Sequence, residues 1–269
     1  MLINRCLTTL LAKRLSARPV VVLTGARQTG KTTLAHDLLP ARIQQPVEYI
    51  NLDDPDERLR LTSDPVRHLD RPGSVLVLDE VHKLPVLLDA VKLLAGQPGG
   101  RKFILLGSAQ VLLLRQVRES LAGRAALLDL WPLAVGEQPS ARVAAATAIA
   151  LQAIWQDGAV ALDRLQRAPP PADLARTFRS RAGQTLLWGG YPALLTLPDE
   201  LERRAWLRDY RRTYLERDLP DLGRVADVTK FIQALNLMAA RTGQILSYSA
   251  LARDLGLAPN SAHRYVRFM

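Results

Sequence analysis

The sequence predicts an α/β protein in which a parallel sheet is followed by a helical region. Three observations lead to this fold class. Several β-branched or apolar runs lack the polar alternation of a half-exposed strand, and enough chain for a helix separates each run from the next. After residue 132 these runs give way to apolar residues at helical spacing.

Bulk properties set the outer limits. At 269 residues the chain exceeds one ordinary domain, and we expect three parts over residues 1–135, 136–225 and 226–269. Cys6 is the sole cysteine, which excludes an internal disulfide and fits a cytoplasmic location. The longest uncharged stretch, 143–156, is too short to cross a bilayer, and the N-terminus lacks a secretory signal, so no membrane partner is expected.

The formal net charge of +10 leaves the question of nucleic acid open. Clustered basic residues would neutralise phosphates. However, residues 1–135 and 136–269 carry equal numbers of basic and equal numbers of acidic residues, so no basic tail is set apart. The basic residues are mostly arginine beside abundant Ala and Leu, a composition that a GC-rich genome produces whatever the partner.

The elements of the first part follow in order. A helix is expected over the first fifteen residues, and PVVVLTG then reads as a strand that ends in a glycine loop and passes into the helix TTLAHDLL. The segment DDPDE, which follows the second strand, reads as an acidic turn. The four later strands are predicted over 47–53, 74–80, 102–108 and 126–133.

Helices dominate the second half. Candidates lie over 143–156, 171–187 and 201–219, with the motif Gly189-Gly190-Tyr191-Pro192 between the last two. The final stretch, SYSALARDLGLAPNSAHRYVRFM, reads as helix, short turn and helix, with Asn260 or Ser261 as the N-cap of the second helix.

The loop after the first strand carries the most specific motif. GARQTGKT, from Gly25 to Thr32, fits G-x-x-x-x-G-K-[ST] and lies between a strand and a helix, where main-chain N–H groups and the helix dipole can hold phosphates. Lys31 would reach the β- and γ-phosphates of ATP, and the Thr32 hydroxyl would ligate Mg²⁺. Arg27 and Gln28 either contact phosphate or project outward. The predicted phosphate-binding residues are Gly25, Ala26, Arg27, Gln28, Thr29, Gly30, Lys31, Thr32 and Thr33.

Two acids end the third strand. Asp79 and Glu80 follow the apolar run SVLVL, and ligands of parallel sheets collect beyond the carboxyl ends of the strands. Asp79 would hold Mg²⁺, and Glu80 would polarise the water that attacks the γ-phosphate. The alternative is a strand that simply ends in solvated acids.

Two further polar residues are catalytic candidates. Ser108, at the end of the fourth strand, either senses the γ-phosphate or caps the following helix. Arg124, just before the fifth strand, either stabilises the transferring phosphoryl group as an arginine finger or is an ordinary surface residue. The histidines show no metal-ligand spacing.

With these residues in place, the chain resembles the AAA-type ATPases of bacteria and archaea that carry a C-terminal domain of unknown function. The likeness extends over nearly the whole chain. It is carried by GARQTGKTTL, LDEVHKLP, LLGSAQ, ESLAGR, GGYP and TYLERDL, in that order, and by the terminal helix pair.

The resemblance implies an AAA-type core, a helical lid and a winged-helix unit. It also implies that Arg124 acts as the finger, which assembly into a homo-oligomer would bring to a neighbour, and that Pro192 lies near the adenine. Members of the family continue past Met269, so the wing and terminal domain are expected to be absent from this sequence, which is then a shortened protein, a fragment or a truncated gene product. The terminal helix pair either binds DNA or serves as a packing module.

Three functions are compatible with these motifs. The favoured hypothesis is an ATPase whose nucleotide state drives a conformational switch. The second is a nucleotide-gated DNA-binding regulator with little turnover. The third is a small-molecule kinase, which the tandem acids and the helical second half argue against.

Overall fold

The computed structural model describes residues 2–97, 101–107, 121, 123–138, 160, 163, 171–213 and 227–268. The chain divides into two compact units, Met1–Arg203 and Arg204–Met269. Each unit has its own buried core. Among the described residues, no helix combines the length and the apolar character needed to cross a bilayer.

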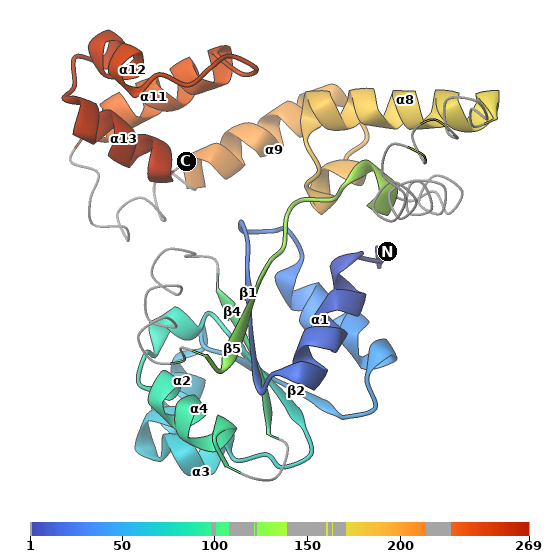
Figure 1. Cartoon of the computed structure of the whole chain (residues 1–269), viewed down its shortest axis with the longest axis vertical. Helices are drawn as coiled ribbons and strands as arrows, with labels where there is room; N and C mark the ends of the chain where they lie inside the picture. The colour runs from blue at the N-terminus through green and yellow to red at the C-terminus, as the bar shows by residue number, and fades with distance from the viewer. Residues whose placement is uncertain are drawn as a thin grey trace. The chain divides into compact units, whose positions relative to one another are not determined.

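A five-stranded parallel sheet forms the centre of the first unit (Figure 1). The strand order is β2-β3-β4-β1-β5, and every pairing is parallel, which confirms the predicted sheet. The strands are β1 (Val20–Thr24), β2 (Val47–Asn51), β3 (Val75–Asp79), β4 (Lys102–Gly107) and β5 (Ala125–Asp129). β2, β3 and β5 end before the predicted carboxyl-terminal residue, each at a polar side chain: Asn51, Asp79 and Asp129.

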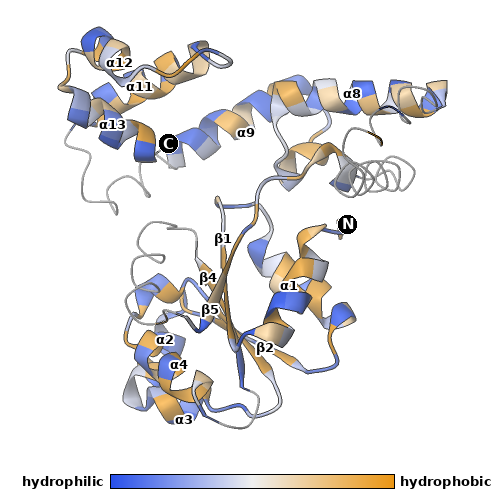
Figure 2. Ribbon diagram, viewed as in Figure 1, coloured by the Kyte–Doolittle hydropathy of each residue, from blue (hydrophilic) through white to orange (hydrophobic). Residues whose placement is uncertain are grey.

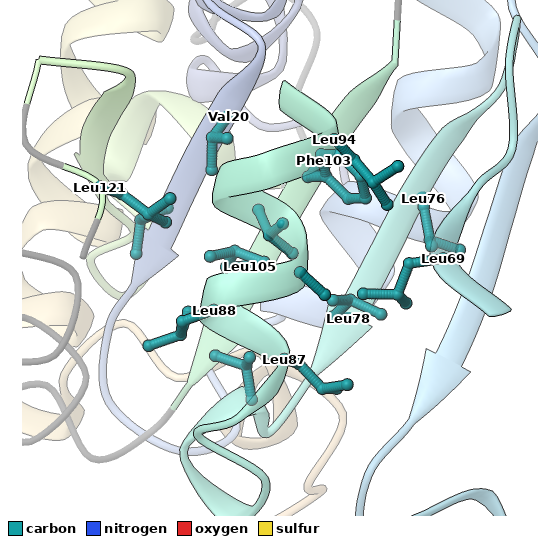
Figure 3. Close-up of a cluster of buried hydrophobic side chains, with 14 of the residues drawn as sticks. Val20, Leu69, Leu76, Leu78, Leu87, Leu88, Leu94, Phe103, Leu105 and Leu121 are labelled. Atoms are coloured by element: carbon teal, nitrogen blue, oxygen red, sulfur yellow. The ribbon is translucent and has the colours of Figure 1, made fainter. Parts of the chain in front are cut away.

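Alternate residues of the central strands serve two different cores. Val20 and Val22 of β1 join one cluster, whereas Val21 and Leu23 join the other. Both sets are buried because helices cover both faces of the sheet, which explains why the strands are apolar throughout (Figure 2). Figure 3 shows the first cluster, where leucines of α4 (Leu87–Ala95) pack beside Phe103 and Leu105 of β4.

The helices of the sheet domain are short and locally specified. Asp54 caps α2 by accepting a hydrogen bond from the Asp56 N–H, and Pro55 occupies the first helical position. The segment DDPDE is therefore largely the start of a helix, and the prediction of a plain turn was wrong. The elements are α1 (Leu7–Ala17), η1 (Thr33–Leu38), η2 (Leu39–Arg42), α2 (Pro55–Ser63), α3 (Pro65–Leu69) and η3 (Val81–Lys83).

A strap, defined here as residues 130–138, follows β5 and ends in the single turn η4 (Val135–Glu137). Two contacts tie it to the next helical segment: the Leu133 N–H donates to the Gly190 carbonyl at 2.7 Å, and the Gln138 amide donates to the Thr185 hydroxyl at 2.6 Å. The helices here are α8 (Ala172–Trp188), η5 (Pro192–Leu195) and α9 (Glu200–Thr213). The predicted helix over 171–187 is confirmed, and the one over 143–156 lies outside the described residues.

Three helices make the core of the second unit: α11 (Val228–Ala240), α12 (Tyr248–Leu255) and α13 (Pro259–Phe268). They bury Phe231, Leu251 and Tyr265 against one another. The predicted short turn between two helices is confirmed, and Gly256 ends α12 in the left-handed conformation. The predicted N-cap was wrong, because α13 already begins at Pro259, whose fixed φ suits the first helical position. The winged-helix assignment stays a prediction.

Candidate functional site

The loop from Gly25 to Gly30 turns the chain from β1 into a helix. Gly25 has φ +150°, and a Cβ there would lie 2.3 Å from the Leu130 carbonyl oxygen. Gly30 has φ +92°, a conformation that other residues avoid. The helix starts directly afterwards, since the Leu34 N–H donates to the Gly30 carbonyl at 2.9 Å. The sequence therefore builds the curled loop with glycine at the two positions where a side chain would not fit or would be strained.

Lys31 is buried beside this loop, with 7% of its surface exposed. Its Nζ donates to the carbonyl oxygens of Gly25 at 2.8 Å and Ala26 at 2.9 Å. The Thr29 hydroxyl also donates to the Ala26 carbonyl, at 2.8 Å. A positive charge held among main-chain groups at a helix N-terminus is suited to an anionic ligand.

Asp79, the last residue of β3, lies directly against the loop. The Thr32 hydroxyl donates to Asp79 Oδ2 at 2.6 Å, and the Tyr49 hydroxyl donates to the same oxygen at 2.8 Å. The other oxygen, Oδ1, accepts from the Glu80 N–H at 2.9 Å. Asp79 is 6% exposed, so the carboxylate is fixed by three hydrogen bonds. The structure thus brings together the two motifs that the sequence assigned to one site.

Tyr49 was missed in the sequence. It lies on β2, two residue pairs before the end of the β2–β3 ladder, where Asn51 is paired with Asp79. Burial and the neighbouring Asp79 carboxylate raise the pKa of Tyr49 well above its usual value. Its hydroxyl therefore remains protonated, and remains a donor to Asp79, throughout the neutral range.

Glu80 has an unusual backbone and a basic neighbour. Its φ of +54° and ψ of +41° place it in the left-handed region, which is uncommon for a residue other than glycine and often marks functional sites. His82 Nδ1 lies 3.3 Å from Glu80 Oε2, and the two side chains are 13% and 15% exposed. The sequence assigned His82 no role, because a single histidine carries no spacing signal.

Arg5 connects the loop to the strap and was also missed. Its guanidinium donates to the Thr29 carbonyl at 2.7 Å, to the Trp131 carbonyl at 2.5 Å and to the Glu137 carboxylate at 3.2 Å. Glu137 also accepts from the N–H groups of Cys6 at 2.7 Å and Ala134 at 3.0 Å. This buried ion pair joins the N-terminal segment, the loop and the strap.

The polar groups around Asp79 fit a magnesium ion better than a transition metal. Hydroxyl and carboxylate oxygens are the ligands that Mg²⁺ prefers, and a nucleotide-bound Mg²⁺ needs only one or two of them from the protein. In the described part of the chain, no group of three or more His, Cys, Asp and Glu residues could hold a metal ion alone. Thr32 and Asp79 are the residues that would hold the ion beside a triphosphate.

The other predicted residues have different outcomes. Ser108 follows β4 and lies outside the described residues. Arg124 precedes β5, and its guanidinium donates to the Lys92 carbonyl at 3.2 Å. β5 runs parallel to β1, so Arg124 lies at the amino ends of these strands. The phosphate-binding loop of the same chain lies at their carboxyl ends. A finger role for Arg124 therefore requires a second chain and stays a prediction.

The positions of the remaining loop residues and of the GGYP motif do little to define the site. Gln28 is exposed at φ +59°, Arg27 is partly buried, and Thr33 lies in the first turn of the helix. Pro192 begins η5, two residues after the Gly190 that bonds to the strap. Its place near the adenine stays a prediction.

Comparison with known proteins agrees with this geometry. Residues 17–138 match the AAA domain family. The first part of the chain is therefore similar to AAA domains. Residues 179–269 match a domain of unknown function, DUF8612. The resemblance read from the motifs is therefore confirmed: an AAA-type P-loop domain is followed by a domain of unknown function.

Relatives extend the likeness over most of the chain. Uncharacterized proteins of Mycobacterium tuberculosis (Rv2008c) and Mycobacterium bovis (Mb2031c) are each 30% identical over 257 residues, which is 95% of this chain and 48% of the relative. The chain thus spans about half the length of these relatives. The Walker-type ATPase PABY2304 of Pyrococcus abyssi is similar in fold, with a TM-score of 0.51 at 16% identity over 98% of this chain and 96% of that chain.

Proposed function

We propose that this AAA domain binds ATP with Mg²⁺ and hydrolyses it. The observation that carries the proposal is the 2.6 Å hydrogen bond between Thr32 and Asp79, which joins the end of the phosphate-binding loop to the acids of β3. These groups are 47 residues apart in sequence and meet at the carboxyl edge of the sheet, where ligands of such sheets bind.

Lys31 and the loop supply the binding energy for the phosphates. The Lys31 ammonium is already desolvated and satisfied by two loop carbonyls. A triphosphate in the curl competes for this ammonium and gains the N–H groups at the start of the helix. Bound magnesium neutralises charge on the phosphate oxygens.

Glu80 is the proposed general base. Its carboxylate takes a proton from the water that attacks the γ-phosphorus, the bond to the β-phosphate oxygen breaks, and ADP and inorganic phosphate leave. The main-chain N–H of Glu80 donates to Asp79 Oδ1, so the residue that carries the base also helps to orient the metal-side carboxylate. The Glu80 side chain is partly buried, which limits the access of bulk water to its carboxylate.

Magnesium-dependent phosphate release tests the assignment. Lys31→Ala should lower ATP affinity at least about tenfold, because the loss of a hydrogen-bonded charge is worth roughly 1.5–3 kcal/mol. Glu80→Gln should retain ATP while losing turnover. Lys13→Ala and Glu202→Gln, at exposed positions on α1 and α9, are matched controls and should behave as wild type. Equal phosphate release by Glu80→Gln and wild type would show that Glu80 is not the base.

Coupling of nucleotide state to the rest of the chain is part of the same proposal. Arg5 bonds to the Thr29 carbonyl within the loop and to the strap, and the strap bonds to α8 through Gln138. A shift of the loop on phosphate binding therefore pulls on the strap. Proteolysis within the strap should differ between ATP-bound and ADP-bound protein, and identical cleavage in both would contradict a switch.

A second candidate function, DNA binding gated by nucleotide, is favoured by α13. One side of α13 buries Ala262 and Tyr265 against α11 and α12. The opposite side exposes four hydrogen-bonding side chains, spaced along one helical face: Asn260, His263, Arg264 and Arg267. The helix contains no acidic residue. A basic helix presented by a short turn suits the major groove of duplex DNA, which admits an α-helix.

Fluorescence anisotropy with a 30-base-pair duplex tests this second function. The Arg264→Ala/Arg267→Ala double variant should lose at least about tenfold in affinity and should reduce the salt slope by about two, because each phosphate contact contributes roughly one. Arg176→Ala/Arg179→Ala on the exposed surface of α8 removes the same charge and is the control. Equal loss in both double variants would indicate only nonspecific attraction.

A further inference from the structure

We propose that Tyr49 is a positioning residue for the magnesium side of this site: its hydroxyl holds the Asp79 carboxylate in the orientation that a nucleotide-bound metal requires. The inference rests on the proposed ATP function and adds a residue to it. It is carried by one juxtaposition, in which the Tyr49 and Thr32 hydroxyls donate to the same oxygen of Asp79 at 2.8 and 2.6 Å.

The acceptor capacity of Asp79 makes this arrangement specific. A carboxylate has about four acceptor sites, two on each oxygen. Tyr49 and Thr32 occupy both sites on Oδ2, and the Glu80 N–H occupies one on Oδ1. One site on Oδ1 remains within this set. Asp79 is thereby left with a single defined direction in which to accept a further hydrogen bond.

Thr32 cannot fix this carboxylate alone. A hydroxyl has one proton and two lone pairs, so Thr32 can donate to Asp79 while its lone pairs face a metal. Thr32 is exposed at the start of the helix. The orientation of its hydroxyl therefore changes with the ligand that the loop binds. Tyr49 comes instead from β2, which is paired with β3 on the sheet. It therefore holds the Asp79 carboxylate from the neighbouring strand.

The surroundings of Tyr49 support a positional role. Its ring packs edge-on against His36 of the helix that follows the loop, with 5.4 Å between ring centroids, and it borders the second core cluster. Packing fixes the ring, and the fixed ring fixes the position of the hydroxyl oxygen. Removal of the hydroxyl alone should leave the ring packing intact.

Nucleotide titrations of Tyr49→Phe, with and without magnesium, test the proposal. A fluorescent ATP analogue is bound in excess EDTA and then at increasing Mg²⁺. We expect affinity in EDTA within twofold of wild type, because Lys31 and the loop are untouched, and a magnesium concentration for half-maximal tightening about tenfold higher, as for loss of a hydrogen bond to a charged group. Tyr265→Phe loses a hydroxyl bonded to the Asp227 carbonyl in the other unit and should match wild type in both titrations.

The outcomes separate the two proposals. If wild-type protein binds no ATP under either condition, the proposed function fails and the role of Tyr49 fails with it. If wild type responds to Mg²⁺ and Tyr49→Phe responds identically or at lower Mg²⁺, only the role of Tyr49 is overturned. If Tyr49→Phe loses affinity equally in EDTA and in Mg²⁺, the tyrosine supports the loop and not the metal side, which also overturns the proposal.

Discussion

Replacing Arg5 with methionine should destabilise the first unit, because the change leaves a buried carboxylate without its cation. The Arg5 and Glu137 side chains are 6% and 7% exposed, and methionine retains most of the apolar stem. Removing one partner of a buried pair costs about 3–5 kcal/mol. Glu137 keeps the N–H groups of Cys6 and Ala134, so we expect the lower end, about 3 kcal/mol, against wild type.

Thermal unfolding followed by circular dichroism measures this loss. A cost of about 3 kcal/mol corresponds to a fall in Tm of roughly 6–12 °C for a domain of this size. Arg5→Met/Glu137→Gln removes both charges and should recover part of the loss. The exposed pair of Arg60 and Glu57, at 40% and 34% exposure, is the control, and Arg60→Met should change stability by less than about 1 kcal/mol. Equal Tm values for Arg5→Met and Arg60→Met would refute the reasoning.

Two further predictions concern the loop and its neighbour. Gly25→Ala should weaken ATP binding and lower Tm, since its Cβ would lie 2.3 Å from the Leu130 carbonyl oxygen, whereas Gly183→Ala, with nothing within 4 Å, should do neither. The rate at which iodoacetamide alkylates Cys6 should reach half its maximum at a pH above the ordinary thiol pKa of about 8.5. Burial and the Glu137 carboxylate raise the pKa of the Cys6 thiol, so less of the reactive thiolate is present at any given pH. Glu137→Gln should move that midpoint down, and an unchanged midpoint would exclude the carboxylate as a cause.

The sheet and the two motifs were predictable because their signals are local. A continuous apolar run such as VLVL between Val75 and Leu78 has one stable place, a strand buried on both faces. The glycine loop likewise specifies its own conformation, as the positive φ values of Gly25 and Gly30 show. Strand ends and caps were less accurate: at Pro259, for example, the fixed φ of proline starts the helix before the expected cap.

The missed residues act over long sequence separations. Arg5 meets Glu137 across 132 positions, and Tyr49 meets Asp79 across 30. Nothing in the neighbouring residues of Arg5 or Tyr49 distinguishes them from other arginines and tyrosines. Strand order brings Tyr49 to Asp79, and neither apolar patterning nor motif spacing specifies that order. Likewise, the parallel pairing of β1 and β5 places Arg124 at the end of the sheet away from the loop.

A crystal structure with Mg²⁺ and a non-hydrolysable ATP analogue tests the central claim most directly. We predict the triphosphate inside the curl between Gly25 and Thr32, with Lys31 Nζ moved from the loop carbonyls to phosphate oxygens and the metal on the Thr32 hydroxyl, on the side of Asp79. A nucleotide bound elsewhere, with Lys31 Nζ still on the carbonyls of Gly25 and Ala26, would contradict the account.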